Sequence, residues 1–196
     1  MNLIITKGTY PEPDFDIKAA LRYAGATVDS AETVSLAREC FKEVQPALLY
    51  KVCYTKLNVS VNGNICDFGV FQVESENLAK NLERCKEVII FAATIGSGYD
   101  RIINRYSRIS PAKALMVQAI GAERVEALCD TFCDDMEKKY NIKLKPRFSP
   151  GYGDLALDVQ KNIFSILDCP RKIGISLNDS LLMSPSKSVT AFVGII

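Results

Sequence analysis

The stretch Glu87-Val-Ile-Ile-Phe-Ala-Ala93 decides the fold class of this sequence. Its apolar run is continuous rather than alternating, which predicts a strand that is buried on both faces. A glycine-rich turn, Thr94-Ile-Gly-Ser-Gly-Tyr-Asp100, follows it and leads into a helical pattern. A dinucleotide-binding fingerprint would need glycine at the position of Arg101, so we interpret the turn as a sharp strand-to-helix connection rather than a phosphate-binding loop.

The segments around this strand favour hairpins over parallel units. Residues 48–61 alternate in polarity, Asn62-Gly63 supplies the residues of a tight hairpin turn, and residues 65–73 return along the first strand. We also expect strands at 3–6, 173–177 and 188–195, and helices at 14–24, 30–44, 75–84, 99–106, 111–140 and 157–167. This mixture predicts an α+β fold with a mixed or antiparallel sheet, hairpin strands and several helices.

The expected helix at 111–140 has two distinct faces. Apolar residues at three- and four-residue spacing predict a buried stripe, which consists of Val125, Leu128, Cys129, Phe132, Cys133 and Met136. An acidic row lies beside it and consists of Glu123, Glu126, Asp130, Asp134 and Glu137. We interpret the acidic row as a solvated face of the helix.

The composition excludes several classes of function. The 24 Lys and Arg residues almost balance the 23 Asp and Glu residues, which argues against a nucleic-acid or anionic-membrane partner. The absence of histidine removes the commonest general base, the Ser-His and Cys-His nucleophile pairs and histidine metal ligands. We therefore expect neither catalytic residues of an independent hydrolase nor a metal site in this chain.

The cysteines and the N-terminal residues indicate a compartment. Residues 1–13, MNLIITKGTYPEP, lack the basic and apolar regions of a secretory signal, and the longest apolar stretch, 88–95, is about half of a membrane span. We therefore expect a soluble, cytoplasmic chain whose seven cysteines are reduced and mostly buried. Cys129 and Cys133 are one helical turn apart and could hold a metal, but core packing is the favoured interpretation.

The loop Arg147-Phe-Ser-Pro-Gly-Tyr-Gly-Asp154 is the best candidate for a binding site. Pro150-Gly151 is typical of a type II turn, in which glycine takes the positive φ. Arg147 offers a planar guanidinium that suits a carboxylate, and Tyr152 adds an aromatic wall. The pattern is equally compatible with a structural loop in which Arg147 pairs with a residue of the acidic row.

Two motifs together resemble the activation (reactivation) domain of cobalamin (vitamin B12)-dependent methionine synthase. The family carries R-x-x-P-G-Y, which stands here as Arg147-Phe-Ser-Pro-Gly-Tyr152. A second segment of the family stands here as Leu177-Asn-Asp-Ser-Leu-Leu-Met-Ser-Pro-Ser-Lys-Ser-Val189. The resemblance covers residues 115–195, and residues 92–100 are similar to the standalone bacterial members. It implies one activation-type domain over 1–196, with a helical and hairpin lobe at 1–85 and a ligand-binding part at 86–196.

The resemblance implies that the chain binds S-adenosylmethionine in a shallow groove. By matching positions, Arg147 would hold the ligand carboxylate, and Glu126 would face the amino or sulfonium end. Ser149, Pro150 and Gly151 would form the turn that presents backbone groups to the ligand, and Tyr152 would pack on it.

The resemblance also implies a function in repair. The chain would be an accessory component of a methyltransferase that supports reductive methylation of cob(II)alamin. The cobalamin would be carried by a methionine synthase partner chain, and a flavodoxin-like protein would be the reductant. Two alternatives stay open: a protein-interaction module that has lost S-adenosylmethionine, and a reactivator of another corrinoid methyltransferase.

Overall fold

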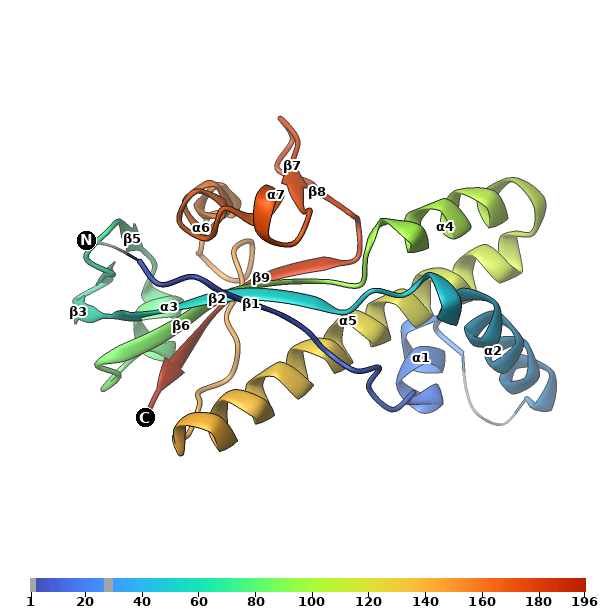
Figure 1. The fold of residues 1–196 in the computed structure, drawn as a ribbon, viewed down its shortest axis with the longest axis horizontal. Helices are drawn as coiled ribbons and strands as arrows, with labels where there is room; N and C mark the ends of the chain where they lie inside the picture. The colour runs from blue at the N-terminus through green and yellow to red at the C-terminus, as the bar shows by residue number, and fades with distance from the viewer. Residues whose placement is uncertain (1–2, 27–29) are drawn as a thin grey trace.

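The computed structural model describes residues 3–26 and 30–196, and its centre is a four-stranded antiparallel sheet with the strand order β1-β2-β6-β9 (Figure 1). The strands of this sheet are β1 (Thr6–Thr9), β2 (Lys51–Asn58), β6 (Glu87–Thr94) and β9 (Ser188–Ile195). The sheet draws two strands from before residue 86 and two from after it, so the two parts inferred from the sequence share one sheet. The α+β prediction is confirmed.

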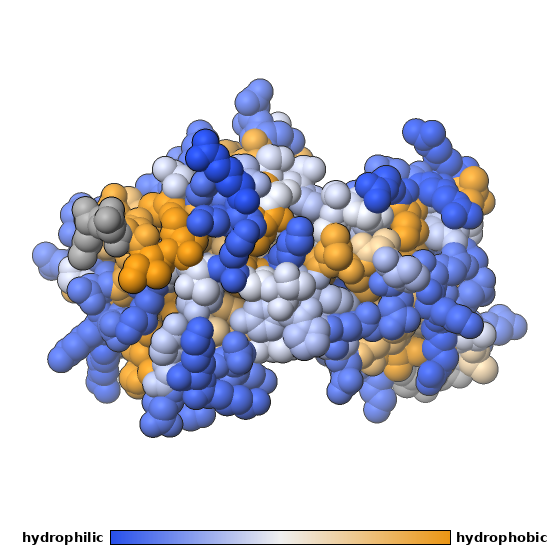
Figure 2. All heavy atoms as spheres, in the orientation of Figure 1, coloured by the Kyte–Doolittle hydropathy of each residue, from blue (hydrophilic) through white to orange (hydrophobic). Residues whose placement is uncertain are grey.

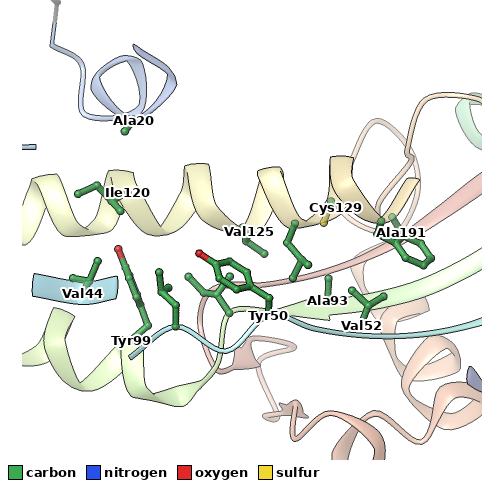
Figure 3. Packing of buried hydrophobic residues seen from close by; sticks show 14 of the residues in the cluster. Ala20, Val44, Tyr50, Val52, Ala93, Tyr99, Ile120, Val125, Cys129 and Ala191 are labelled. Carbon is green, nitrogen blue, oxygen red and sulfur yellow. The ribbon is translucent and has the colours of Figure 1, made fainter. Parts of the chain in front are cut away.

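Strand β6 is apolar from Val88 to Ala93 because it separates two hydrophobic cores. Ile89, Phe91 and Ala93 belong to the first core, which β6 forms with the helices that begin at residues 17, 31, 97 and 111. Figure 3 shows Ala93 of this core facing the last of these helices. Val88 and Ile90 belong to the second core, with the helices that begin at residues 76 and 160. Both neighbours of β6 are hydrogen-bonded to it along all of its eight residues. The predicted two-sided burial is confirmed.

Six helices in the described part of the chain lie close to the predicted positions, and the short helix Cys169–Lys172 was not predicted. The helices are α1 (Ile17–Tyr23), α2 (Ala31–Val44), α3 (Glu76–Asn81), α4 (Ser97–Ile109), α5 (Pro111–Tyr140), α6 (Gln160–Leu167) and α7 (Cys169–Lys172), with 3-10 turns η1 (Gln45–Ala47) and η2 (Leu157–Val159). Helix α1 starts later than predicted because the Asp16 carboxylate caps it. No helix within the described ranges is long and apolar enough to cross a membrane.

The predicted long hairpin is divided into shorter strands. A small second sheet contains β3 (Ser60–Asn62), β4 (Ile65–Asp67) and β5 (Gln72–Glu74). The 48–61 prediction was wrong at 48–50, which precede β2, and at Val59. The ladder of β2 with β6 ends at Asn58, the Val59 N–H donates to the Lys86 carbonyl at 2.9 Å, and residues 60–62 pair with β4 instead. The hairpin turn is Gly63-Asn64 rather than Asn62-Gly63, and only Gly63 has a positive φ.

Two other strand predictions also need correction. The predicted return strand at 65–73 is interrupted because Phe68 turns inward and stacks on Phe192, with 5.1 Å between the ring centroids. The first strand is Thr6–Thr9 rather than 3–6, since residues 6–9 pair with β2. Most residues of the expected strand at 173–177 do not pair with any other described strand. Only β7 (Ser176–Leu177) pairs, with β8 (Met183–Ser184).

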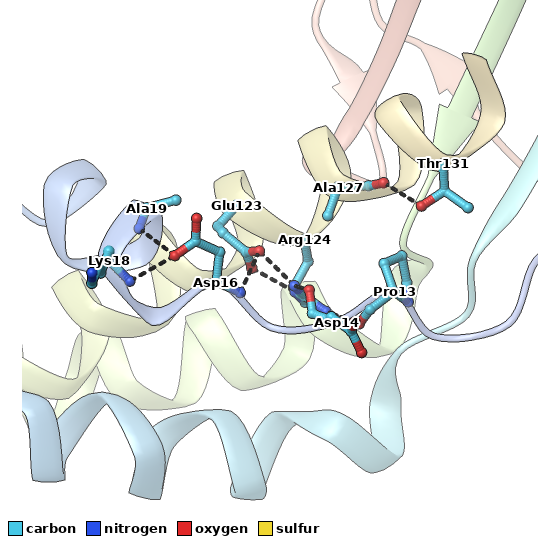
Figure 4. A network of polar contacts seen from close by, with 9 residues as sticks. All are labelled: Pro13, Asp14, Asp16, Lys18, Ala19, Glu123, Arg124, Ala127 and Thr131. Atoms are coloured by element: carbon cyan, nitrogen blue, oxygen red, sulfur yellow. Dashed lines mark hydrogen bonds and ion pairs between the residues drawn. The ribbon is translucent and has the colours of Figure 1, made fainter. Parts of the chain in front are cut away.

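The Glu123–Arg124 pair ties the N-terminal segment to α5, and we call it the Arg124 clamp (Figure 4). The Arg124 guanidinium donates to both carboxylate oxygens of Glu123 and to the backbone carbonyls of Pro13 and Asp14. Glu123 also accepts from the backbone N–H of Asp16 at 3.2 Å. The prediction of a solvated acidic row was therefore wrong at Glu123, which is buried because the segment before α1 covers it.

The surface is polar over most of the face seen in Figure 2, with hydrophobic residues gathered at the end near the small sheet. All seven cysteines are free thiols, and only Cys133 is partly exposed. Burial raises the pKa of the Cys129 thiol, which lies in the first core. The prediction that the cysteines are mostly buried is confirmed.

Candidate functional site

A cleft of about 800 Å³ lies between α5 and the chain that follows it. Five of the six residues that the sequence nominated line it: Glu126, Arg147, Ser149, Pro150 and Tyr152. The sixth, Gly151, lies within the turn between them. The rest of the lining comes from Asp130, Cys133, Asp134 and Glu137 of α5, residues 144–146 and 148, Gln160 of α6, Met183 of β8 and Ser188–Thr190 of β9.

The end of α5 creates this arrangement by reversing the chain. Asn141 adopts the left-handed conformation with φ of 51°, which ends the helix. The segment that returns runs beside the edge strand β9, and Phe148 exchanges two backbone hydrogen bonds with Phe192. Leu144 is held from the other side, because its N–H donates to the Glu137 carboxylate at 2.8 Å. The segment is thereby fixed between α5 and the sheet.

Arg147 reaches across the cleft to two members of the acidic row, and we call these three residues the Arg147 cluster. Its guanidinium donates to Glu126 at 2.7 Å and to Asp130. The Arg147 side chain is 22% exposed, against 41% for Glu126 and 71% for Asp130. Burial by itself lowers the pKa of Arg147, but the charges and hydrogen bonds of its neighbours outweigh burial, so that the pKa is raised. The arginine is therefore a permanent cation, already neutralised from one side.

The Ser149–Tyr152 segment is a β-turn of the predicted kind. The Tyr152 N–H donates to the Ser149 carbonyl at 3.2 Å, and Gly151 has φ of 91°. The Gly151 N–H is used within the loop, where it donates to the Leu155 carbonyl at 2.8 Å. Tyr152 is 69% exposed, so its ring stands at the mouth of the cleft as an uncovered aromatic surface.

Asp154 anchors this loop to α3, a contact that sequence reasoning missed. Its carboxylate accepts from the Ser75 hydroxyl at 2.5 Å and from the backbone N–H groups of Glu76 and Asn77. The hydrogen bond from Ser75, together with those from the backbone, lowers the pKa of Asp154. Helix α3 therefore holds the end of the loop, in the manner of a helix cap supplied from a distant part of the chain.

Gln160 is the second functional candidate that sequence reasoning missed. It is the first residue of α6, lines the cleft and is 5% exposed. Its side-chain oxygen is buried and accepts no hydrogen bond from the described residues. Leaving such an acceptor without a donor costs about 1–3 kcal/mol. No pattern in the sequence distinguishes this glutamine from an ordinary polar residue at the start of a helix.

The cleft is acidic overall. Four carboxylates line it, those of Glu126, Asp130, Asp134 and Glu137, against the two cations of Lys145 and Arg147. The difference, two cations minus four carboxylates, is a local charge of −2. Such a site attracts a ligand that carries net positive charge, while Arg147 provides one position for an anionic group. A ligand with both kinds of charge fits this distribution.

A sequence model of the family "Vitamin B12 dependent methionine synthase, activation domain" matches residues 75–195. The chain belongs to this family. The matched region begins at the Ser75 cap of α3 and contains the entire Arg147 cluster, the Ser149–Tyr152 turn and Gln160. Among curated proteins, none matches the sequence.

A solved structure supports the fold of this activation domain. The chain is similar to the protein described as "Crystal Structure of the MetH Reactivation Domain bound to AdoHcy", with a TM-score of 0.72 and 13% sequence identity. The match covers 98% of this chain and 78% of the other. It therefore extends the similarity in fold to the N-terminal part, which lies outside the region matched by sequence.

Proposed function

We propose that this activation domain binds S-adenosylmethionine in the cleft and presents its methyl group to a cobalamin-bearing methionine synthase chain. The observation that carries the proposal is the Arg147 cluster, which places a guanidinium and two carboxylates at the wall of an acidic cleft. S-Adenosylmethionine has a carboxylate, an ammonium group and a sulfonium, so its charges complement this set.

Each residue has a defined task in this proposal. Arg147 binds the ligand carboxylate, and Glu126 binds the ammonium group that accompanies it. The turn of Ser149, Pro150 and Gly151 lets the ligand approach the main chain, and Tyr152 packs on the ligand at the mouth of the cleft. Asp154 supports the turn through α3 and does not touch the ligand.

The chemistry requires positioning rather than proton transfer. The partner's cofactor supplies a strong cobalt nucleophile after one-electron reduction, and the sulfonium is already an activated leaving group. The chain therefore has to hold the methyl group in line with the nucleophile, which needs no general base. An activation domain without histidine suits this task, and we expect a flavodoxin-like protein to deliver the electron.

The first test is calorimetric titration of S-adenosylmethionine into the wild type, Arg147→Met and Arg108→Met. Arg108 is exposed on α4 and does not line the cleft, so it is a matched control for the loss of one arginine. We expect wild-type binding to weaken about 10- to 100-fold in Arg147→Met and to stay unchanged in the control. A wild-type chain that gives no saturable binding would contradict the proposal.

The second test addresses the partner. A cobalamin-dependent methionine synthase that lacks its own activation domain is oxidised and then incubated with this chain, S-adenosylmethionine and a chemical reductant. We expect recovery of activity with the wild type and not with Arg147→Met. If the chain instead binds the partner tightly, with an affinity that changes neither on addition of S-adenosylmethionine nor in Arg147→Met, a protein-interaction module is favoured.

A further inference from the structure

The cleft passes around one edge of the central sheet and therefore has two different halves. Strand β9 is the edge strand, and its residues Ser188–Thr190 lie in the cleft. Helices α5 and α6 pack on opposite faces of the sheet, α5 in the first core and α6 in the second (Figure 1). One half of the cleft is thus built on α5 and the other on α6.

The two halves differ in chemistry. The α5 half carries the Arg147 cluster and the other acidic side chains. The α6 side presents the carboxamide of Gln160 and, from β8, the thioether of Met183, and it carries no carboxylate among the described residues. Its charged residue is Lys145, whose stem lies beside Cys85 of the second core. Tyr152, which also lines the cleft, belongs to the turn that lies between Arg147 and α6 along the chain. A ligand with a charged end and a flat, uncharged, hydrogen-bonding end matches this division.

Gln160 stands out on the α6 side because its position in the helix favours an apolar residue. Ile163 and Phe164, three and four residues further along α6, are buried in the second core. Three buried polar side-chain atoms lack a partner among the described residues, those of Tyr50, Asn81 and Gln160. Of these three, Gln160 alone lines the cleft. The oxygen itself is covered in this structure, but the residue that carries it lines the cleft, so a rotation of the carboxamide would offer the acceptor to a donor from the ligand.

We propose that Gln160 is a ligand-binding residue, whose carboxamide accepts a hydrogen bond from an N–H or O–H group of the nucleoside half of the ligand. The inference rests on the proposed function, and it sets the direction of the ligand in the cleft: the amino-acid end lies on the α5 side and the nucleoside end on the α6 side. Gln160 then distinguishes a nucleoside sulfonium from other cationic amino acids, which the Arg147 cluster alone cannot do.

The test compares Gln160→Met with Gln118→Met. Gln118 is exposed on α5 and does not line the cleft, so it controls for the chemical change. We expect Gln160→Met to weaken S-adenosylmethionine about tenfold and Gln118→Met to leave it unchanged. Adenosine and L-methionine, followed at millimolar concentration by NMR, separate the halves: Gln160→Met weakens adenosine alone, whereas Arg147→Met weakens L-methionine alone.

The outcomes distinguish this inference from the proposed function. Binding of S-adenosylmethionine that is equal in the wild type and Gln160→Met overturns the role of Gln160 and leaves the proposed function standing. Absence of binding in the wild type overturns both. Methionine is close to glutamine in volume and removes the buried acceptor, so we expect the variant to fold with an unchanged or raised Tm. A readout that needs no variant is the side-chain ¹⁵NH₂ signal of Gln160, which should shift on addition of adenosine but not of L-methionine.

Discussion

The Arg124 clamp and the Arg147 cluster both pair an arginine with carboxylates of α5, but they differ in burial and in the partners of the guanidinium. Arg124 is fully buried and satisfied by both oxygens of Glu123 and by two backbone carbonyls. Arg147 contacts only side chains, and its partners Glu126 and Asp130 are partly open to solvent. A guanidinium whose donors are used by fixed backbone groups is structural, whereas one held by movable carboxylates can exchange partners.

The largest expected effect is on stability, from Arg124→Met. The substitution leaves the Glu123 charge buried and removes the donors from the carbonyls of Pro13 and Asp14. We expect the free energy of unfolding to fall by about 3–5 kcal/mol, as for other buried pairs that lose one partner. Urea unfolding measures this change. The double variant Glu123→Gln/Arg124→Met should recover part of the loss, and no recovery would show that the charge of Glu123 is not the cause.

An intermediate effect is expected from Asp154, whose contribution depends on pH. Because the folded chain lowers the pKa of Asp154, the stabilisation is complete above the ordinary carboxyl pKa of about 4 and is lost as the pH falls through the lowered value. Asp154→Asn should therefore have a lower Tm than the wild type at pH 6, and the gap should close towards pH 3. Asp179→Asn, at an exposed loop position, is the control. A gap that is independent of pH would contradict the role of the charge.

The smallest effect on stability is expected from Arg147→Met, despite its large effect on ligand binding. Its partners Glu126 and Asp130 are partly exposed, and ion pairs of this kind contribute about 1 kcal/mol or less to the free energy of unfolding. Urea unfolding should thus place Arg147→Met close to the wild type and far from Arg124→Met. Equal destabilisation by the two variants would remove the distinction between a structural and an exchangeable arginine.

The sequence predicts those parts of the fold that depend on local periodicity. The continuous apolar run of β6 and the two-faced pattern of α5 both appear as expected. The break at Val59 could not be predicted, because it depends on where β6 begins to offer a partner. The spacing along α5 likewise places Glu123 and Glu126 in one solvated acidic row. Only the segment around Pro13, which is distant in sequence, decides that Glu123 is buried.

The sequence predicts the part of the candidate site that lies in one continuous motif, and not the part that depends on contacts between distant residues. The loop at 147–152 has a recognisable order of residues, and the resemblance to the family places Glu126 beside it. The contacts of Asp154 join positions 77 to 79 residues apart, and the unpartnered oxygen of Gln160 is a property of its surroundings rather than of its type. Periodicity and motif order contain neither kind of information.

In the Arg147 cluster, binding of an anionic ligand group requires an ion pair within the chain to break. Within the chain the guanidinium is neutralised by Glu126 and Asp130, so an entering carboxylate has to displace one of them. The displaced carboxylate is partly open to water but loses its ion pair. Acetate brings no cation to restore that pair, whereas an amino acid carries one in the same molecule. We therefore expect the cluster to bind zwitterions in preference to simple carboxylates.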